Sequence, residues 1–279
     1  MEAVCEGKRW DVALAFDNRG EVSAALPYLY GSRWGLRYVL QPQLTQYNGP
    51  WYRPDADRQD AARQLQRHLD GLRLALFHQN AAPQLGALPE WDGYEQSSRV
   101  TYRIEDISDP QRVFEAFDKS RRQRQIRRAE KVLTVNEDVT PEQFARFHAA
   151  YWQRRGEKDL LSQEFIIRII RHTLRRGQGI LLGLDDSQGS LQAARFVAYD
   201  GNCAYSLLSA LGDGHPNGAS PLLFWEILKR LSGRCASFDF EGSMDPGIAL
   251  SYSLYGARPT TYLQLTRCRI PLLRRFLHI

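Results

Sequence analysis

The alternation of short apolar segments and tight turns in the second half of the chain constrains its fold most. The sequences at 186–189 and 200–202 combine Asp, Gly and Asn, which favour tight turns. A glycine-rich loop at 212–219 precedes an apolar-faced helix. This order predicts a meander of strands followed by helix, strand, helix and strand, and therefore an α/β unit. We expect its strands at 180–184, 191–199, 203–211, 237–240 and 260–265, and its helices at 222–231 and 248–254.

The first half of the chain has a similar outline. Residues 11–16 and 21–30 flank the turn sequence Asp17-Asn18-Arg19-Gly20, which predicts a hairpin. Apolar residues at helical spacing predict an amphipathic helix over 57–69. Both halves thus read as α/β units with mixed, mostly antiparallel sheets flanked by helices, and we predict two such units in tandem. Further strands are expected at 36–40, 72–78, 99–105 and 132–136.

Capping sequences mark where helices begin. Ser108-Asp109-Pro110-Gln111 and Thr140-Pro141-Glu142-Gln143 have the form of capping boxes with an early proline. Ser220 is expected to be the N-cap of a later helix, with Pro221 as its first residue. The helix after Ser108 is expected to continue into a strongly basic stretch. Further helices are expected at 163–174 and at 271–278.

The positive charge of the chain is local. The net charge is +5, and residues 118–131 alone contain seven Lys/Arg against two Asp/Glu. A local excess argues against a general nucleic-acid coat, so DNA is not an expected partner. The basic helix could instead bind the phosphate groups of CoA, tRNA or a lipid-linked precursor. The alternative is a solvated charged helix between two domains; the best functional candidates are Arg124, Arg127 and Arg128.

Bulk properties indicate a cytoplasmic protein. No run of about 18 apolar residues occurs, so no transmembrane helix is expected. The N-terminus is acidic and polar, where a signal peptide would be basic and then apolar. The four cysteines are widely separated, which is typical of free thiols in a reducing compartment. No two histidines have the sequence spacing that is typical of metal ligands, and no metal site is expected.

Two acids near the expected strand at 237–240 are candidates for proton transfer. If the chain is extended there, Asp239 and Glu241 share one face while Phe238 and Phe240 point the other way. A carboxylate there could accept a proton from a substrate group. The alternative is that the acids bond to backbone N–H groups and fix the following turn. Glu241 is the better base candidate because it lies nearer the strand end.

Two tyrosines on the next helix are candidates for the matching proton donor. Tyr252 and Tyr255 are three residues apart and therefore neighbours on one helix face. The alternative for each is core packing with a satisfied hydroxyl. Gly256 is expected to end the helix in a left-handed conformation.

The glycine-rich loop and the strand before it are candidates for binding an anionic ligand. Free N–H groups at a helix N-terminus bind anions, and glycines let a phosphate approach the backbone. Backbone N–H groups around Ser209 to Leu211 could polarise an acyl carbonyl. The alternative is a plain loop with an N-cap. The candidate residues are Ser209, Leu211, Gly212, Gly214, Asn217, Gly218, Ala219 and Ser220.

A loop in the first half is a candidate pocket wall. Residues 41–52 are rich in proline, aromatic and amide side chains, among them Gln46 and Tyr47. These two are the substrate-binding candidates of the first half. A surface loop anchored by two rings is the alternative.

Several segments together resemble a known family. They read FDFEGSM, GIALSYSLYGARP, GASPLLFWEILK, RQRQIRRAEK and QPQLTQYNGPWY. The chain resembles the Gcn5-related N-acetyltransferase (GNAT) superfamily, in a bacterial branch close to the Fem-type peptidoglycan-bridge aminoacyltransferases, which carry two such folds in tandem. The resemblance implies two acetyltransferase-like units, at 1–107 and 108–279. The loop 212–219 departs from the usual pyrophosphate motif, Q/R-x-x-G-x-G/A, because it lacks the basic leading residue.

The function that the resemblance implies is acyl transfer. The expected donor is acyl-CoA, used as a co-substrate and not as a permanently bound cofactor. The expected acceptor is an amine or hydroxyl group of a small molecule or a cell-wall precursor. In this family a tyrosine on the helix of Tyr252 and Tyr255 can protonate the leaving thiolate. The alternatives are an aminoacyl-tRNA-dependent ligase and a non-catalytic binding module on the same fold.

Overall fold

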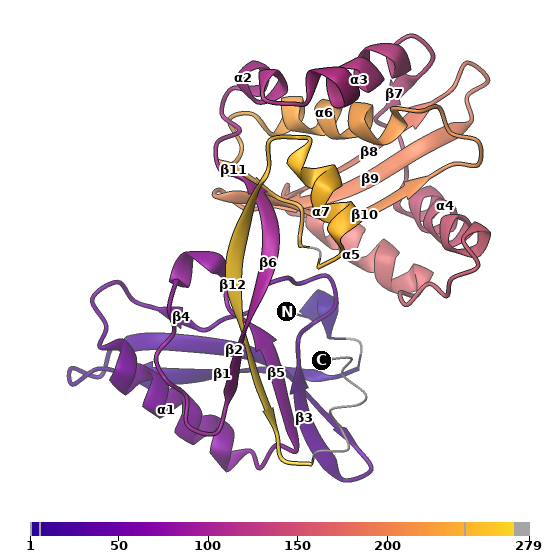
Figure 1. Cartoon of the computed structure of the whole chain (residues 1–279). Helices are drawn as coiled ribbons and strands as arrows, with labels where there is room; N and C mark the ends of the chain where they lie inside the picture. The colour runs from indigo at the N-terminus through magenta and orange to yellow at the C-terminus, as the bar shows by residue number, and fades with distance from the viewer. Residues whose placement is uncertain (1, 6, 243, 271–279) are drawn as a thin grey trace. The chain divides into compact units, whose positions relative to one another are not determined.

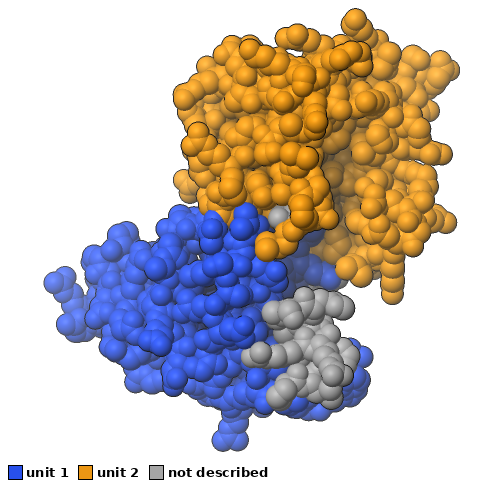
Figure 2. All heavy atoms as spheres, viewed as in Figure 1, with its two compact units in different colours: residues 1–100, 261–279 blue, residues 101–260 orange. Residues whose placement is uncertain are grey.

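The computed structural model describes residues 2–5, 7–242 and 244–270. The chain forms two compact units, which Figure 2 shows in different colours. Unit 1 comprises residues 1–100 and 261–279, and unit 2 comprises residues 101–260. The chain passes from one unit to the other inside strand β6 (Glu95–Ile104) and again inside strand β12 (Arg258–Cys268). The division of the chain into acetyltransferase-like units at 1–107 and 108–279 stays a prediction.

Unit 1 is built on strands in the order β1-β2-β3-β5-β12. Strands β3 and β5 are parallel, whereas the pairs β1–β2, β2–β3 and β5–β12 are antiparallel. Helix α1 begins after Asp57, whose carboxylate accepts the backbone N–H groups of Gln59 and Asp60. The elements are η1 (Glu2–Val4), β1 (Arg9–Phe16), β2 (Val22–Arg33), β3 (Leu36–Leu40), β4 (Trp51–Tyr52), α1 (Arg58–Gly71), β5 (Leu76–Asn80) and η2 (Pro83–Leu85).

Unit 2 has strands in the order β6-β11-β10-β9-β8-β7. The pair β10–β11 is parallel and the other pairs are antiparallel. The elements are α2 (Pro110–Glu115), η3 (Lys119–Gln123), α3 (Arg124–Ala129), β7 (Thr134–Asn136), α4 (Pro141–Arg154), α5 (Gln163–Arg175), β8 (Gly179–Asp185), β9 (Leu191–Tyr199), β10 (Cys203–Leu211), α6 (Ala219–Leu231), β11 (Ser237–Asp239) and α7 (Pro246–Ser253).

Helices cover both faces of the sheet in unit 2. Residues 193–197 of β9 are all buried, which requires cover on both sides of the strand. Figure 1 shows α3 and α6 over one face of β8 to β10 and α4 and α5 over the other. Helix α6 is the most apolar of these helices, and its Phe224 is fully buried in the core of the unit.

The predicted fold class is confirmed. Both units combine mostly antiparallel strands with flanking helices. The strands predicted at 36–40, 191–199 and 203–211 begin and end at the predicted residues. The capping box at Thr140 is also confirmed, because its hydroxyl accepts the N–H of Gln143 and the Gln143 side chain accepts the N–H of Thr140.

Two predicted N-caps were wrong. Asp109, not Ser108, caps α2, because its carboxylate accepts the N–H groups of Gln111 and Arg112 at 2.9 and 3.2 Å. The Ser108 hydroxyl instead donates a hydrogen bond to Asp106 Oδ1 at 2.6 Å. Gly218, not Ser220, precedes α6, and the helix begins at Ala219. Gly218 has a φ of +110°, which a serine would not readily adopt.

The continuous basic helix expected after Ser108 was also wrong. Helix α2 ends at Glu115. The Asp118 carboxylate then accepts the N–H of Arg121 at 2.7 Å and starts a turn of π-helix, η3, which leads into α3. The basic residues therefore lie on two short consecutive helical segments, η3 and α3, and not on a continuation of α2. The last predicted helix, 271–278, lies outside the described residues.

Replacement of Gly218 by alanine tests the approach of α3 to the start of α6. A Cβ atom at Gly218 would lie 2.4 Å from the Gln125 carbonyl oxygen, and the backbone is left-handed. We expect Gly218→Ala to lower the free energy of unfolding by about 3 kcal/mol, because strain and a backbone clash act together. Gly214→Ala is the matched control, since Gly214 is left-handed but has nothing within 4 Å. It should cost about 1 kcal/mol. Equal losses in urea unfolding would contradict the close approach.

Candidate functional site

Strands β10 and β11 separate after a short parallel pairing. They pair only at Cys203–Tyr205 and Ser237–Asp239. β10 continues beside β9 as far as Leu211, with a register shift between Ser206 and Leu208. Within the described part of unit 2, the other edge of residues 206–211 thus faces no strand. This open edge can present backbone groups to a ligand.

Two of the predicted amides point toward the open edge. The Gly212 N–H points toward β9 and donates to the carbonyl of Gln192 in that strand at 2.8 Å. Because successive residues of a strand point to opposite edges, the N–H groups of Ser209 and Leu211 point away from β9. The Leu211 carbonyl lies on that same side and accepts the guanidinium of Arg154 from α4. The open edge is therefore fixed by a side chain from a neighbouring helix.

The glycine-rich loop is anchored on α3. The Gln125 side-chain amide donates to Asn217 Oδ1 at 2.9 Å, and the backbone at Gly218 lies close against the Gln125 carbonyl. Ser220 occupies the second position of α6, so its N–H belongs to the first turn of the helix. The loop brings Gly212, Gly214, Asn217, Gly218, Ala219 and Ser220 to the N-terminal end of α6.

The three candidate arginines of α3 are exposed. Across the described residues, the Arg124, Arg127 and Arg128 guanidinium groups have no hydrogen-bond or ion-pair partner. They share with Gln125 the helix that holds the loop. Their charge is therefore available to an anion, although solvent screens it.

Arg195 is a candidate site residue that the sequence analysis missed. It lies on β9, is 8% exposed, and its Nη2 donates to the Ser220 hydroxyl at 3.4 Å. Its guanidinium carbon lies 5.7 Å from the Phe224 ring centre, and its Nε has no partner. Burial lowers the pKa of this guanidinium, but an arginine stays protonated in proteins. A buried cation aimed at the first turn of α6 makes this helix end a candidate anion site. The available signal was one charged residue inside the apolar run 193–198.

Tyr255 packs in the core. Its ring contacts Phe117, Phe224 and Phe240 at centroid distances of 5.2, 4.8 and 5.8 Å. The Arg122 guanidinium lies 4.5 Å over the same ring and donates to the carbonyl and hydroxyl of Ser251. Burial raises the pKa of Tyr255. Gly256 follows with a φ of +75°, as expected for a left-handed helix end.

Tyr252 lies at the margin of this cluster. It is partly buried and stacks on Phe240 with a centroid distance of 4.4 Å. Burial raises its pKa, the acids Glu241 and Asp239 raise it further, and Arg195 lowers it. The phenol is therefore protonated at neutral pH and lies within the field of both acids and of Arg195. Of the two tyrosines, Tyr252 is the more accessible to a substrate.

The prediction that Asp239 and Glu241 share one face of a strand was wrong. β11 ends at Asp239, and Glu241 has a φ of +61°, so the chain turns between the two acids. Asp239 is 1% exposed, and its Oδ1 accepts the Thr101 hydroxyl at 2.5 Å and the Glu241 N–H at 2.7 Å. Its Oδ2 lies 3.8 Å from Arg103 Nε. Asp239 thus fixes the turn, while Glu241 is only partly buried and can face a substrate.

The remaining two candidates lie in unit 1. The Gln46 side chain donates to the Tyr262 hydroxyl at 3.2 Å, and the rings of Tyr47 and Tyr262 meet edge to face at 5.2 Å. The Asn80 side chain donates to the Gln46 carbonyl at 3.0 Å. All the other candidates belong to unit 2.

Residues 2–5, 7–242 and 244–270 contain neither a metal-binding cluster nor a membrane-spanning helix. In these ranges no group of three or more His, Cys, Asp or Glu side chains is arranged to hold a metal ion. The same ranges contain no helix with the length and apolar character needed to cross a bilayer.

Removal of the Asp239 charge tests its structural role. We expect Asp239→Asn to lower the free energy of unfolding by about 3 kcal/mol, because a buried carboxylate that holds three groups would be lost. Asp213→Asn, in the exposed part of the glycine-rich loop, is the control and should change stability little. Urea unfolding followed by circular dichroism measures both. A stable Asp239→Asn protein would remove the turn-fixing role.

Comparisons with known proteins concern the fold and one segment of the chain. Residues 118–246 match the family model of the acetyltransferase (GNAT) domain. The whole chain is similar in fold to FemX, with 12% identity, a TM-score of 0.67, and 96% of this chain and 90% of that chain covered. L-PGS from Bacillus licheniformis has 13% identity, a TM-score of 0.60, and coverages of 97% and 86%.

A tandem GNAT protein from the clavulanic acid biosynthesis pathway has 14% identity, a TM-score of 0.57, and coverages of 94% and 83%. None of the curated proteins matches the sequence. At these identities the structural similarities show the fold alone, and the family model supplies the assignment. Residues 118–246, somewhat less than half of the chain, are therefore similar to the acetyltransferase (GNAT) domain family.

Proposed function

We propose that the protein is an acyltransferase that moves an acyl group from acyl-CoA to an amine or hydroxyl acceptor. The observation that carries the proposal is the parting of β10 from β11 beside the start of α6. It leaves the N–H groups of Ser209 and Leu211 unpaired with another strand, just before the loop that leads to the start of α6, inside the segment that matches the GNAT family. Acyl transfer needs both features together, because one polarises a carbonyl and the other holds a charged donor.

In this proposal the first turn of α6 and Arg195 bind a phosphate of the donor. Helix N-termini favour anions, and a buried guanidinium adds a charge that water screens little. The loop 212–219 lacks the basic leading residue of the usual family motif. Arg195 approaches the same helix turn from β9 and supplies positive charge there. The N–H groups of Ser209 and Leu211 donate to the acyl oxygen.

The proposed reaction is direct attack of the acceptor on the thioester carbonyl. An amine nitrogen forms the new bond to the acyl carbon, and the bond between that carbon and the CoA sulfur breaks. Glu241 accepts the proton that the amine loses, directly or through water, and the Tyr252 phenol gives a proton to the departing thiolate. The acceptor is a small molecule or a cell-wall precursor with an amine or hydroxyl group.

A second candidate function is transfer of an aminoacyl group from tRNA. The exposed and unpartnered Arg124, Arg127 and Arg128 favour it, because arginines bind the phosphates of nucleic acids. A non-catalytic binding module on the same fold is the third. The first function requires binding and turnover of acyl-CoA, the second requires binding and turnover of aminoacyl-tRNA, and the third requires binding without turnover.

Titration calorimetry distinguishes the donors. We expect acetyl-CoA or a longer acyl-CoA to bind, and Arg195→Met to weaken binding by roughly 2 kcal/mol because a charge-assisted hydrogen bond is lost. Arg146→Met, an exposed arginine of α4, is the matched control and should bind like the unmodified protein. Absence of binding by every acyl-CoA would overturn CoA as the donor. Binding of tRNA that is abolished by reversing the α3 arginines to glutamate would then support the second function.

Removal of one hydroxyl tests the proton donor. We expect Tyr252→Phe to lower the turnover of bound acyl-CoA by about 100-fold, with little change in acyl-CoA affinity. Because burial raises the pKa of Tyr252 above its ordinary value of 10.0, activity should persist to a higher pH than that value would allow. Tyr255→Phe is the matched control, and a steady-state assay across pH measures both variants. Equal rates in the two variants would remove Tyr252 from the mechanism.

A further inference from the structure

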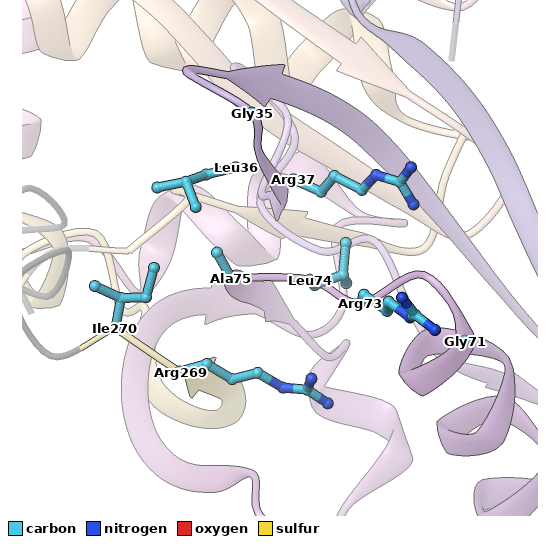
Figure 3. A pocket seen from close by; sticks show the side chains of 9 residues that line it. All are labelled: Gly35, Leu36, Arg37, Gly71, Arg73, Leu74, Ala75, Arg269 and Ile270. Atoms are coloured by element: carbon cyan, nitrogen blue, oxygen red, sulfur yellow. The ribbon is translucent and has the colours of Figure 1, made fainter.

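Unit 1 contains a pocket of about 650 Å³ that is separate from the candidate site residues. Its walls come from the start of β3, the end of α1, the segment before β5 and the residues after β12 (Figure 3). None of the predicted site residues lines it. The volume lies in the range of ordinary small-molecule sites.

Arginines dominate the lining of this pocket. Arg37, Arg73 and Arg269 line it, and their side chains extend toward the same side in Figure 3. No acidic residue is among the lining residues. Leu36, Ala75 and Ile270 supply an apolar part of the wall. The pocket therefore offers several guanidinium groups beside a small apolar surface.

These arginines are weakly neutralised. Arg37 Nη1 donates to the Leu72 carbonyl at 3.4 Å. Arg269 Nη2 lies 3.6 Å from Asp70 Oδ1, but the same carboxylate also pairs with Arg267. Among residues 2–5, 7–242 and 244–270, the Arg73 side chain has no hydrogen-bond or ion-pair partner. One shared carboxylate thus leaves the pocket with an excess of positive charge.

Arg73 occupies a backbone position that favours glycine. It follows Leu72, the C-cap of α1, and has a φ of +51°. Its N–H donates to the Asp70 carbonyl at 3.1 Å, as in a left-handed helix end. A non-glycine residue is strained there, and strained residues cluster at functional sites. This backbone observation is independent of the charge and of the cavity.

We propose that this pocket binds the phosphate group of a small molecule whose adjoining part is apolar. The planar guanidinium forms paired hydrogen bonds to phosphate oxygens, which makes arginine the suitable side chain for such a group. Arg37 and Arg73 bind the phosphate, and the wall formed by Leu36, Ala75 and Ile270 contacts the apolar part. The inference concerns unit 1 alone and does not depend on the proposed acyl transfer.

Titration of the full chain with phenyl phosphate at low salt tests the proposal. We expect binding, with inorganic phosphate binding more weakly because it has no apolar part. Arg73→Gly should lower the affinity at least tenfold while thermal unfolding shows a fold that is as stable or more stable, since glycine relieves the left-handed backbone. Arg37→Ala should also lower the affinity. Arg19→Ala, in the exposed turn between β1 and β2, is the matched control and should leave it unchanged.

Vesicles that contain phosphatidic acid in phosphatidylcholine distinguish the source of the phosphate. Binding to these vesicles that is lost in Arg73→Gly and Arg37→Ala would assign a lipid headgroup, and binding to phenyl phosphate alone would assign a free small molecule. Both results support phosphate recognition. The proposal is overturned if the unmodified protein binds neither probe, if the two variants bind as it does, or if Arg19→Ala loses as much affinity as they do.

Discussion

The buried carboxylate of Asp239 is the interaction on which the arrangement of unit 2 depends. It accepts the Thr101 hydroxyl from β6 and the N–H of Glu241, two residues further along the chain. The first contact ties β11 to β6, and the second turns the chain out of the strand at the point where β10 continues beside β9. A buried carboxylate is costly without hydrogen-bond partners. The turn supplies one such partner, the Glu241 N–H, and the Asp239 carboxylate in return stabilises the turn. The open edge of β10 follows from this turn.

The aromatic cluster around Phe224 holds the other side of that edge. Phe224 from α6 contacts Phe238 and Phe240 at 4.9 and 5.0 Å, and Tyr255 at 4.8 Å. One ring therefore joins the helix that starts at the glycine-rich loop, the strand that parts from β10, and the turn after α7. Close packing of these rings fixes where the first turn of α6 lies relative to Tyr252.

The sequence predicted local structure well wherever the cause is local. The strand ends around 186–189 and 200–202 are set by Asp and Gly residues that make their own turns. The N-cap of α6 was missed because Gly218 is required by the Gln125 carbonyl, which comes from a different helix. The left-handed Glu241 was missed although its partner Asp239 is only two residues away, because Asp239 is itself held by Thr101 of β6, far away in sequence. The pairing of β12 with β5, which places 261–279 in unit 1, joins residues far apart in sequence.

The position of Arg195 changes what the charge of the chain indicates. The sequence draws attention to residues 118–131, where the whole net excess of +5 is found. Arg124, Arg127 and Arg128 in this segment are exposed, and charges in water at physiological salt are screened within about 8 Å. Arg195 adds only one charge but lies where the effective dielectric is low, so it acts more strongly on an anion at the start of α6. Its neighbours Tyr252 and Tyr255 are phenols, and burial raises the pKa of each further above its ordinary value of 10.0. Arg195 therefore acts on an anion at the start of α6 from inside the protein, together with the carboxylates of Asp239 and Glu241. The exposed arginines of α3 affect mainly the approach of a ligand from solution.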